Sequence, residues 1–480
     1  MEKKTLKTKK VSSKKIKYFE VSGDILVPDV KPDIISVISV NTLSYIYKED
    51  IQKDKVRLDG MVDSYISYIS DSGELRSIKS SHALVEQIED DDIDENSKLE
   101  YTLEEYMVEA KVLNERKVSL KIKLKLEYNV YDEQDIELPD FSTNSLENVE
   151  KLEENITVKK IIGFGKGKSS VKEKLKLGDN LELAEILKVN VDIRSEECKM
   201  TFNKGLAKAD IIMKVMFLTE NGTIEIKEEK YNAMCFIDID GVTDKDLAKC
   251  LYKLKNVQII PNDALRNELE INLEFDVEVE CYAFETINVI EDMYMIDKDV
   301  KFSKEEKYIY EIHDTKKDLI EVSERIRLDS VSKVHDMDLR IIFDEKQDAN
   351  LEVKLYVSQD SNTLSLKILR VPFIVNGDLN SFKFNILEKR FLLNGEFLEL
   401  DVKIEKEECY DKLRKITILD NIEIENKKND DCTMCMYFVK RGDTIFNIAK
   451  EFNMRKEQLL KINELESEEI SSGDKLFIVR

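Results

Sequence analysis

The sequence has no long hydrophobic segment. Nowhere in its 480 residues is there a run of the ~18 apolar residues that a transmembrane helix needs. The lysines between Lys3 and Lys17 are not followed by the apolar core that a signal peptide requires. We therefore expect a chain that spans no membrane and stays in the compartment where it is made.

Histidine and cysteine are scarce, which leaves little chemistry for catalysis. The three histidines, His82, His313 and His335, show neither metal-site spacing nor a neighbouring nucleophile motif. The seven cysteines are odd in number and irregularly spaced, which argues against a disulfide framework and fits a reducing cytoplasm. Cys432 and Cys435 form one CxxC pair without the second pair of a zinc site. They are interpreted as linker thiols, with a redox or shared metal role as the alternative. The sequence predicts no enzyme, metal or cofactor.

A glycine-rich segment invites comparison with a phosphate-binding loop. Gly163, Gly165 and Gly167 precede Lys168 and Ser169, which is one residue short of the Walker spacing. The residues that follow alternate like a strand and do not open a helix. We expect a linker or a loop at a strand edge here, and no nucleotide site.

Acidic residues outnumber basic ones, and the formal net charge is −24. Residues 1–18 hold eight lysines against Glu2, whereas residues 437–480 are balanced, so the acidic excess lies between them. This field would repel the phosphates of DNA and RNA. It suits a basic partner, or it serves only solubility. The basic start lacks an apolar face, so residues 1–18 are predicted to be a disordered tail, with weak contact to an anionic membrane surface as the alternative.

Three stretches show strict alternation of apolar and polar residues, the pattern of strands with one buried face. They are residues 118–127, 269–280 and 398–405. Each lies downstream of a similar predicted hairpin, which indicates three β-rich repeats. We place them roughly at 19–150, 155–298 and 299–425. Residues 147–155 and 426–435 are predicted linkers, and residues 243–254 a short helix.

The last 45 residues, 436–480, have a different pattern. Tyr437 and Val439 share one face of a strand. Asp443 or Thr444 can cap the helix that follows, and Asn453 can end it. The apolar positions of two helices and a closing strand then follow: Ile445, Ile448, Ala449, Phe452, Leu459, Leu460, Ile462, Leu476 and Ile478. This order predicts a small βααβ unit.

The combination of Gly-Asp-Thr at 442–444, Ile448-Ala449, Asn463 and Gly473 resembles a LysM module. The resemblance implies a shallow groove that binds N-acetylglucosamine chains of peptidoglycan or chitin, or a protein. It implies these groove residues: Gly442, Asp443, Thr444, Ile445, Asn463, Glu464 and Leu465. Ile448, Ala449, Phe452 and Leu460 are expected in the core. Three positions depart from the family: Phe446 replaces a frequent tryptophan, Ser472 a proline and Arg455 a capping serine.

The segment Ile25–Ile34, Ile-Leu-Val-Pro-Asp-Val-Lys-Pro-Asp-Ile, resembles the start of SPOCS-type repeats of spore-forming bacteria. Pro28 and Pro32 fix φ and predict that the chain enters the first repeat extended. With the C-terminal module, the layout resembles the LysM-tipped coat morphogenetic proteins of clostridia. That resemblance implies a mainly β, non-catalytic scaffold with three repeats and a βααβ LysM domain. It would act in the mother-cell cytoplasm at the forespore surface, bound to a coat morphogenetic ATPase.

Overall fold

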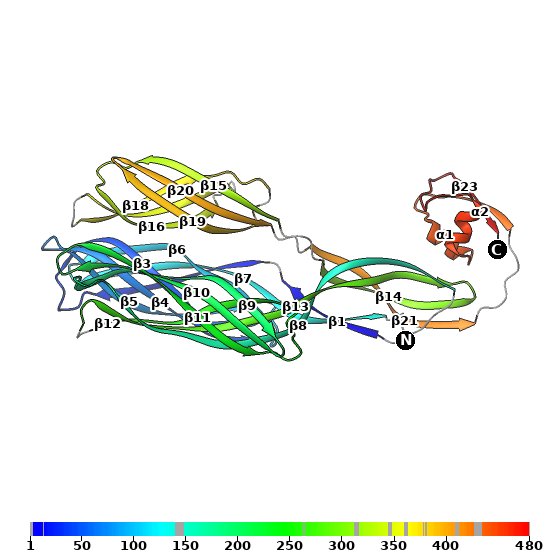
Figure 1. Ribbon diagram of the computed structural model, residues 1–480, viewed down its shortest axis with the longest axis horizontal. Helices are drawn as coiled ribbons and strands as arrows, with labels where there is room; N and C mark the ends of the chain where they lie inside the picture. Colours follow the sequence, from blue (N-terminus) through cyan, green and yellow to red (C-terminus); the bar gives the residue numbers. More distant parts are fainter. Residues whose placement is uncertain are drawn as a thin grey trace.

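The computed structural model describes residues 3–12, 14–139, 148–262, 265–311, 316–343, 348–359, 363–377, 379, 382–408, 412–426 and 434–479. Over these residues the chain forms 23 strands and two short helices, so the predicted mainly β fold is confirmed (Figure 1). Neither helix is long and apolar enough to cross a membrane, judged over the same residues.

The first six-stranded unit is a sandwich of two antiparallel sheets. One sheet has the order β3-β4-β5, and in the other β7 pairs with both β2 and β6. Val118, Leu120 and Ile122 of β7 are buried because every second residue faces the opposite sheet. Each such side chain stabilises the fold by about 1.5–3 kcal/mol. The strands are β2 (Lys15–Leu26), β3 (Ile34–Gln52), β4 (Lys55–Ser70), β5 (Leu75–Glu89), β6 (Lys98–Asn114) and β7 (Lys117–Pro139).

Two further units have the same order of strands and the same pairing, β9-β10-β11 over β8-β13-β12 and β16-β17-β18 over β15-β20-β19. The second unit has β8 (Val149–Lys176), β9 (Leu183–Thr201), β10 (Lys204–Thr219), β11 (Ile224–Asp238), β12 (Leu247–Pro261) and β13 (Glu268–Met295). The third has β15 (Lys316–Arg327), β16 (Lys333–Phe343), β17 (Ala349–Ser358), β18 (Leu364–Pro372), β19 (Phe382–Asn394) and β20 (Phe397–Glu408). Each encloses its own hydrophobic core.

The same backbone hydrogen bond also recurs just after the first strand of each unit, donated to the turn between the last two strands. The three bonds are Val27 N to Arg116 O at 2.9 Å, Leu177 N to Asn267 O at 2.8 Å and Leu328 N to Glu396 O at 2.7 Å. The three units are therefore alike in local detail as well as in topology.

A further cluster of strands, which we call the hub, lies between the sandwiches and the C-terminal module (Figure 1). It consists of β1 (Lys3–Val11), β14 (Lys298–Glu311), β21 (Lys412–Asn426) and the outer halves of β7, β8 and β13. β1 pairs with β7, β8 with β13, and β14 with β21. Their inward side chains form one core: Leu6, Ile136, Leu138, Ile156, Val158, Ile287, Val289, Ile309, Ile416 and Ile418.

The prediction that residues 1–18 form a disordered tail is wrong. Residues 3–11 form β1, and β2 begins at Lys15. The lysines pair with the acidic body, since Lys3 Nζ lies 2.9 Å from Glu137 Oε2 and Lys9 Nζ 3.1 Å from Glu280 Oε2. The lysines that indicate a solvated tail therefore attach strand β1 to the acidic body through ion pairs.

Three other local predictions are also wrong. Residues 247–261 form strand β12 and not the helix predicted at 243–254, because Cys250 and Tyr252 alternate into the core of the second unit. The linker predicted at 147–155 is replaced from Val149 onward by β8, which pairs with β13. Between Pro28 and Pro32, which predict an extended entry to the first repeat, the chain instead turns, and Lys31 N donates to Pro28 O at 2.9 Å. The linker predicted at 426–435 lies largely outside the described residues, which resume at Met434 with β22.

The glycine-rich segment lies inside β8 and not in a loop. A Cβ at Gly165 would come within 2.4 Å of Ile237 Cγ2, and one at Gly167 within 2.4 Å of Cys235 Sγ. The glycines therefore allow β11 to pack closely on β8 and do not cradle a phosphate.

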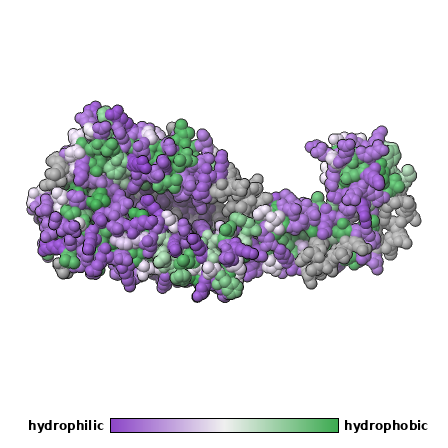
Figure 2. Space-filling model, in the orientation of Figure 1, coloured by the Kyte–Doolittle hydropathy of each residue, from purple (hydrophilic) through white to green (hydrophobic). Residues whose placement is uncertain are grey.

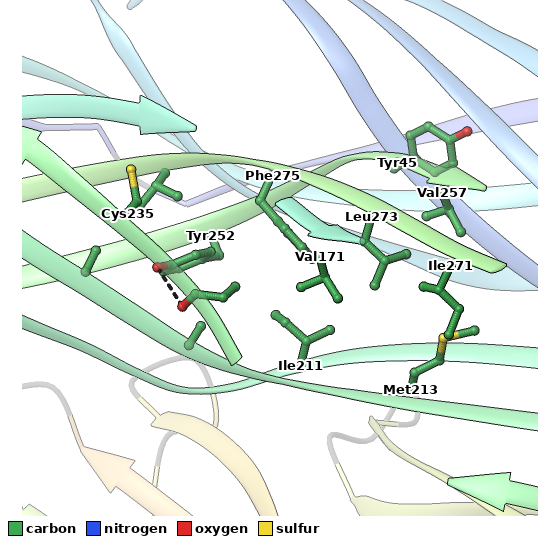
Figure 3. Packing of buried hydrophobic residues seen from close by; sticks show 14 of the residues in the cluster. Tyr45, Val171, Ile211, Met213, Cys235, Tyr252, Val257, Ile271, Leu273 and Phe275 are labelled. Atoms are coloured by element: carbon green, nitrogen blue, oxygen red, sulfur yellow. Dashed lines mark hydrogen bonds between the residues drawn. The ribbon is translucent and has the colours of Figure 1, made fainter. Parts of the chain in front are cut away.

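The sandwiches pack against one another through both apolar and charged contacts. Tyr45 of the first unit lies in the core of the second, beside Val257 (Figure 3). Between the second and third units, Lys188 Nζ lies 2.7 Å from Asp336 Oδ2 and 2.5 Å from Asp338 Oδ2. Lys188 is 1% exposed and Asp336 2%, so these charges are buried at the junction.

Candidate binding site in the C-terminal module

The C-terminal module has the predicted order of elements. β22 (Met434–Phe438) pairs antiparallel with β23 (Lys475–Val479), and α1 (Ile445–Glu451) and α2 (Lys456–Ile462) lie between them. One face of the small sheet packs on the helices, and the shared core includes Val439, Ile448, Ala449, Leu459, Leu476 and Ile478. Phe452 and Leu460, also predicted as core, are partly buried at its margin.

The first loop of the predicted groove is fixed by two side chains before α1. Thr444 is the N-cap, and its Oγ1 accepts a hydrogen bond from Asn447 N at 3.1 Å. Asp443 Oδ2 accepts from Lys440 N at 2.8 Å and from the Tyr437 hydroxyl at 2.9 Å. Gly442 has a φ of 92°, which favours glycine. The turn is thus held before any ligand binds.

These bonds also set the charge of the loop. The N–H of Lys440 and the hydroxyl of Tyr437 stabilise the carboxylate and lower the pKa of Asp443. In return, the hydrogen bond to Asp443 raises the pKa of Tyr437 to about 12. At neutral pH the loop therefore carries a carboxylate whose acceptor Oδ2 is already used within the fold.

The second loop is organised by Asn463, the C-cap of α2. Its Nδ2 donates to Leu459 O and Phe477 O, both at 2.9 Å, and its Oδ1 accepts from Phe477 N at 2.6 Å. Asn463 thus joins the end of α2 to β23, and its amide is largely occupied. Glu464 then reverses the chain with a φ of 54°.

Ile445 was predicted to be an exposed groove contact, and this is wrong. Its side chain is 0% exposed because it is the first residue of α1 and faces the core of the module. Leu465 of the second loop packs against the same core. The two predicted loops therefore meet over one hydrophobic cluster, although Ile445 itself cannot touch a ligand.

The other predicted residues differ in accessibility. Gly442, Thr444 and Glu464 are exposed, whereas Asp443, Asn463 and Leu465 are half-buried. Fewer residues are therefore fully accessible to a ligand than the seven that were predicted to line the groove.

The two loops differ in charge. Lys440 and Arg441 are exposed in the first loop. The second loop carries four exposed acids: Glu464, Glu466, Glu468 and Glu469. Glu468 pairs with Lys456 at 3.0 Å. Such a site can offer hydrogen bonds and ionic contacts to a ligand.

The module is attached to the body by contacts that sequence reasoning did not anticipate. Tyr294 of β13 belongs to the core of the module, and its hydroxyl donates to Met454 O at 2.9 Å. Its ring lies edge-on to Phe446, with 5.3 Å between ring centroids. Lys450 Nζ lies 2.6 Å from Asp292 Oδ1. This attachment uses α1 and the connection to α2, so both groove loops remain uncovered by it.

Phe446, where the family often has tryptophan, thus packs against the body. In the sequence, this attachment is indicated only by an aromatic residue at position 446. Its partner, Tyr294, lies over 150 residues earlier in the chain, so no local pattern pairs the two residues.

The two described histidines, His82 and His335, are half-buried in the fold. His335 Nε2 lies 3.0 Å from Ser358 Oγ, and burial lowers the pKa of His335 to about 4, which keeps the ring neutral. His82 packs over Gly23. His313 and Cys432 lie outside the described residues. Within the described ranges, no three His, Cys, Asp or Glu side chains are placed to hold a metal ion.

Comparison with known proteins gives one match, confined to the C-terminal module. No curated protein and no solved structure matches the chain. Residues 437–479 match the family model described as LysM domain. LysM domains are binding modules without catalytic activity, and they bind the glycan chains of peptidoglycan. The module built from β22, α1, α2 and β23 is therefore a LysM domain.

Proposed function

We propose that this protein is a non-catalytic assembly scaffold whose LysM domain and β-rich body are both binding surfaces. The observation that carries the proposal is the way the LysM domain is held. Tyr294 and Phe446 fix it to the hub, while Gly442, Thr444 and Glu464 of its two loops stay exposed. A binding site held in place at one end of a long body suits a protein that bridges partners.

The three sandwiches are, in this proposal, three copies of one repeat. Their support is the identical strand pairing and the recurring backbone bond after each first strand. The hairpin turns of the first two units match as well. Gly73 N donates to Ser70 O, and Gly222 N donates to Thr219 O. Repeated units of one shape offer repeated surfaces to a partner.

The proposed place of action is the spore coat. The protein would lie in the mother-cell cytoplasm and dock at the forespore surface by binding a coat morphogenetic ATPase. The support is the resemblance of residues 25–34 to SPOCS-type repeats, combined with the LysM domain. The residues of that motif form a loop organised by Arg116, whose guanidinium donates to Val27 O, Pro28 O and Lys31 O and to the Asp33 carboxylate. The motif therefore has a structural role in the first unit.

A second candidate function is binding of peptidoglycan glycan, in the cortex or cell wall. It is favoured by the family match, since LysM domains bind such chains. The charges of the site favour the protein ligand. The exposed acids of the second loop and the exposed Lys440 and Arg441 of the first suit charged side chains better than uncharged sugar hydroxyls.

One pair of binding assays separates the two functions. The full chain is tested for retention on insoluble peptidoglycan, with chitin oligomers as competitor, and for co-purification with the coat ATPase from sporulating cells. We expect the chain to co-purify with the ATPase and to be retained little on peptidoglycan. The double substitution of Glu464→Lys and Glu466→Lys should weaken the co-purification. Retention that chitin oligomers abolish, without ATPase binding, would favour the glycan function.

Localisation during sporulation is the second test. A tagged full chain is expected to encircle the forespore, and removal of residues 437–479 is expected to abolish this. Unchanged encirclement after truncation would move the recruiting role from the LysM domain to the repeats.

A further inference from the structure

The outer face of the β22–β23 sheet is an exposed apolar surface. It consists of five side chains that are exposed by 37 to 79%: Met434, Met436, Phe438, Phe477 and Val479. The cross-strand partners Met434 and Val479, and Met436 and Phe477, make the surface continuous. Single exposed hydrophobic residues are common, but a contiguous patch marks an interaction surface. We call these five residues the outer face.

The outer face is separate from the groove and from the attachment to the hub. Successive residues of a strand point to opposite sides, and the alternate residues Cys435, Tyr437 and Ile478 pack toward the helices. The outer face therefore points away from α1 and α2. Since Tyr294 contacts Phe446 of α1, it also points away from that attachment. Figure 2 shows hydrophobic residues among the mostly hydrophilic surface of the module.

We propose that the outer face binds an amphipathic α-helix of a partner protein, with an apolar stripe of about three turns and acidic residues at one end. A strand of five residues is roughly 17 Å long. Three helical turns span about 16 Å, and a helix is about 10 Å wide. Two paired strands with their side chains therefore offer a flat surface that matches one helix. The proposal goes beyond the groove function, because it concerns a second surface of the LysM domain.

The size of the outer face argues against a second copy of this chain as its occupant. With about 200 Å² for each large side chain, and roughly half of that exposed, the five residues offer about 500 Å². A stable dimer interface needs about 800 Å² from each partner. A single helix needs less, and the methionines can adapt to its side chains.

The charges around the outer face set the direction of the helix. Lys475 is exposed and lies opposite Phe438 in the sheet, with its Nζ 5.7 Å from the centre of the Phe438 ring. The neighbouring Asp474 carboxylate is engaged, accepting from Ser471 N at 2.8 Å. The acidic end of the helix should therefore lie at Lys475.

The proposal is tested with the full chain and a synthetic amphipathic helix of about 18 residues, with leucines on one stripe and glutamates at one end. Binding is measured by fluorescence anisotropy. Since a few central side chains carry most of an interface, we expect the double substitution of Met436→Glu and Phe477→Glu to weaken binding by roughly tenfold or more. The matched control is Phe202→Glu on the second sandwich, where Phe202 is 78% exposed. It should leave binding unchanged.

A charge exchange tests the direction. A peptide with lysines in place of its glutamates should bind the natural chain more weakly, and Lys475→Glu should restore its binding. Glu464→Lys in the groove should change neither result, so failure of the outer face is distinguishable from failure of the groove.

Three outcomes would overturn the proposal. The first is that the natural and doubly substituted chains bind the peptide equally well. The second is that the natural chain is a dimer that the double substitution dissociates. The third is that the chain binds phosphatidylserine vesicles but not the peptide. Circular dichroism of each variant checks that the fold persists.

Discussion

The junction between the sandwiches and the junction of the LysM domain with the hub are built from different chemistry. Between the second and third sandwiches, the ammonium groups of Lys188 and Lys214 both contact Asp336 at 2.7 Å. Although burial opposes ionisation, the two lysines lower the pKa of Asp336. The LysM domain is attached mainly through Tyr294 and Phe446. Buried charges make the first junction costly to open, whereas the second combines one aromatic contact with the Tyr294 hydrogen bond and the Lys450–Asp292 ion pair. The body should therefore behave as one part, and the LysM domain as a docked but separable one.

The largest effect is expected at the buried charges. Lys188→Met leaves Asp336 without one of its cations in a buried site and should reduce the free energy of unfolding by about 3–5 kcal/mol. The measurement is thermal unfolding by calorimetry, in which an early transition of the third sandwich should appear. The matched control is Arg327→Met, whose partner is Glu396 in an exposed pair. It should change stability by no more than about 0.5 kcal/mol.

Tyr294→Ala should release the LysM domain without unfolding the body. Removal of a buried aromatic ring costs about 3 kcal/mol. Here the loss weakens the docking of the LysM domain on the hub and leaves the stability of the body unchanged. Small-angle X-ray scattering should show a larger radius of gyration, and calorimetry an unchanged main transition of the body. Tyr308→Ala is the control, because Tyr308 lies on the hub but is 55% exposed. A compact variant would show that other contacts, such as Lys450 with Asp292, suffice.

A third substitution tests how closely the two sheets of the second sandwich approach each other. Gly165→Val places side-chain atoms where Ile237 already lies, so it should destabilise the fold by about 1–3 kcal/mol in chemical denaturation. Lys166→Val, at the next and 74% exposed position, should have little effect. Equal stability of the two variants would mean that the close packing of β11 on β8 is not needed.

The smallest effect is expected from pH. Folded His335 stays neutral down to about pH 4, whereas an unfolded histidine takes up a proton near pH 6.5. The unfolded state thus binds more protons between these values, so the free energy of unfolding should fall as pH drops from about 6.5 to 4. The slope is at most about 1.4 kcal/mol per pH unit, and partial exposure of the ring reduces it. His335→Gln should flatten this slope, as measured by denaturation across the pH range.

Local pattern predicted much of the fold but not its long-range pairing. Alternation identified β7, β13 and β20, because burial of one sheet face fixes every second residue. The same rule applies at β12, but the spacing of Leu247, Leu251 and Leu254 there favours a helix. The hub is not predictable from local pattern, since nothing near Lys3 indicates that its strand pairs with residues 131–139.

The local structure of the two predicted groove loops follows from the sequence only in part. The turn at Gly442 to Thr444 and the helix end at Asn453, with its φ of 49°, follow from residue chemistry alone. Whether Ile445 faces inward or outward depends on how α1 is rotated over the sheet, which local sequence does not fix. The attachment by Tyr294 is a tertiary contact and had no local signal.

The pairing of strands in the hub sets the order in which parts of the chain can fold during synthesis. β1 leaves the exit tunnel first, yet it finds its partner only when residues 131–139 have emerged, and β14 waits for residues 412–426. The sandwiches enclosed between these strands can form earlier, because their pairings are complete within each unit. A chain that ends before residue 412 therefore carries finished sandwiches and a β14 that lacks β21, its main partner, which leaves an open edge prone to join another chain.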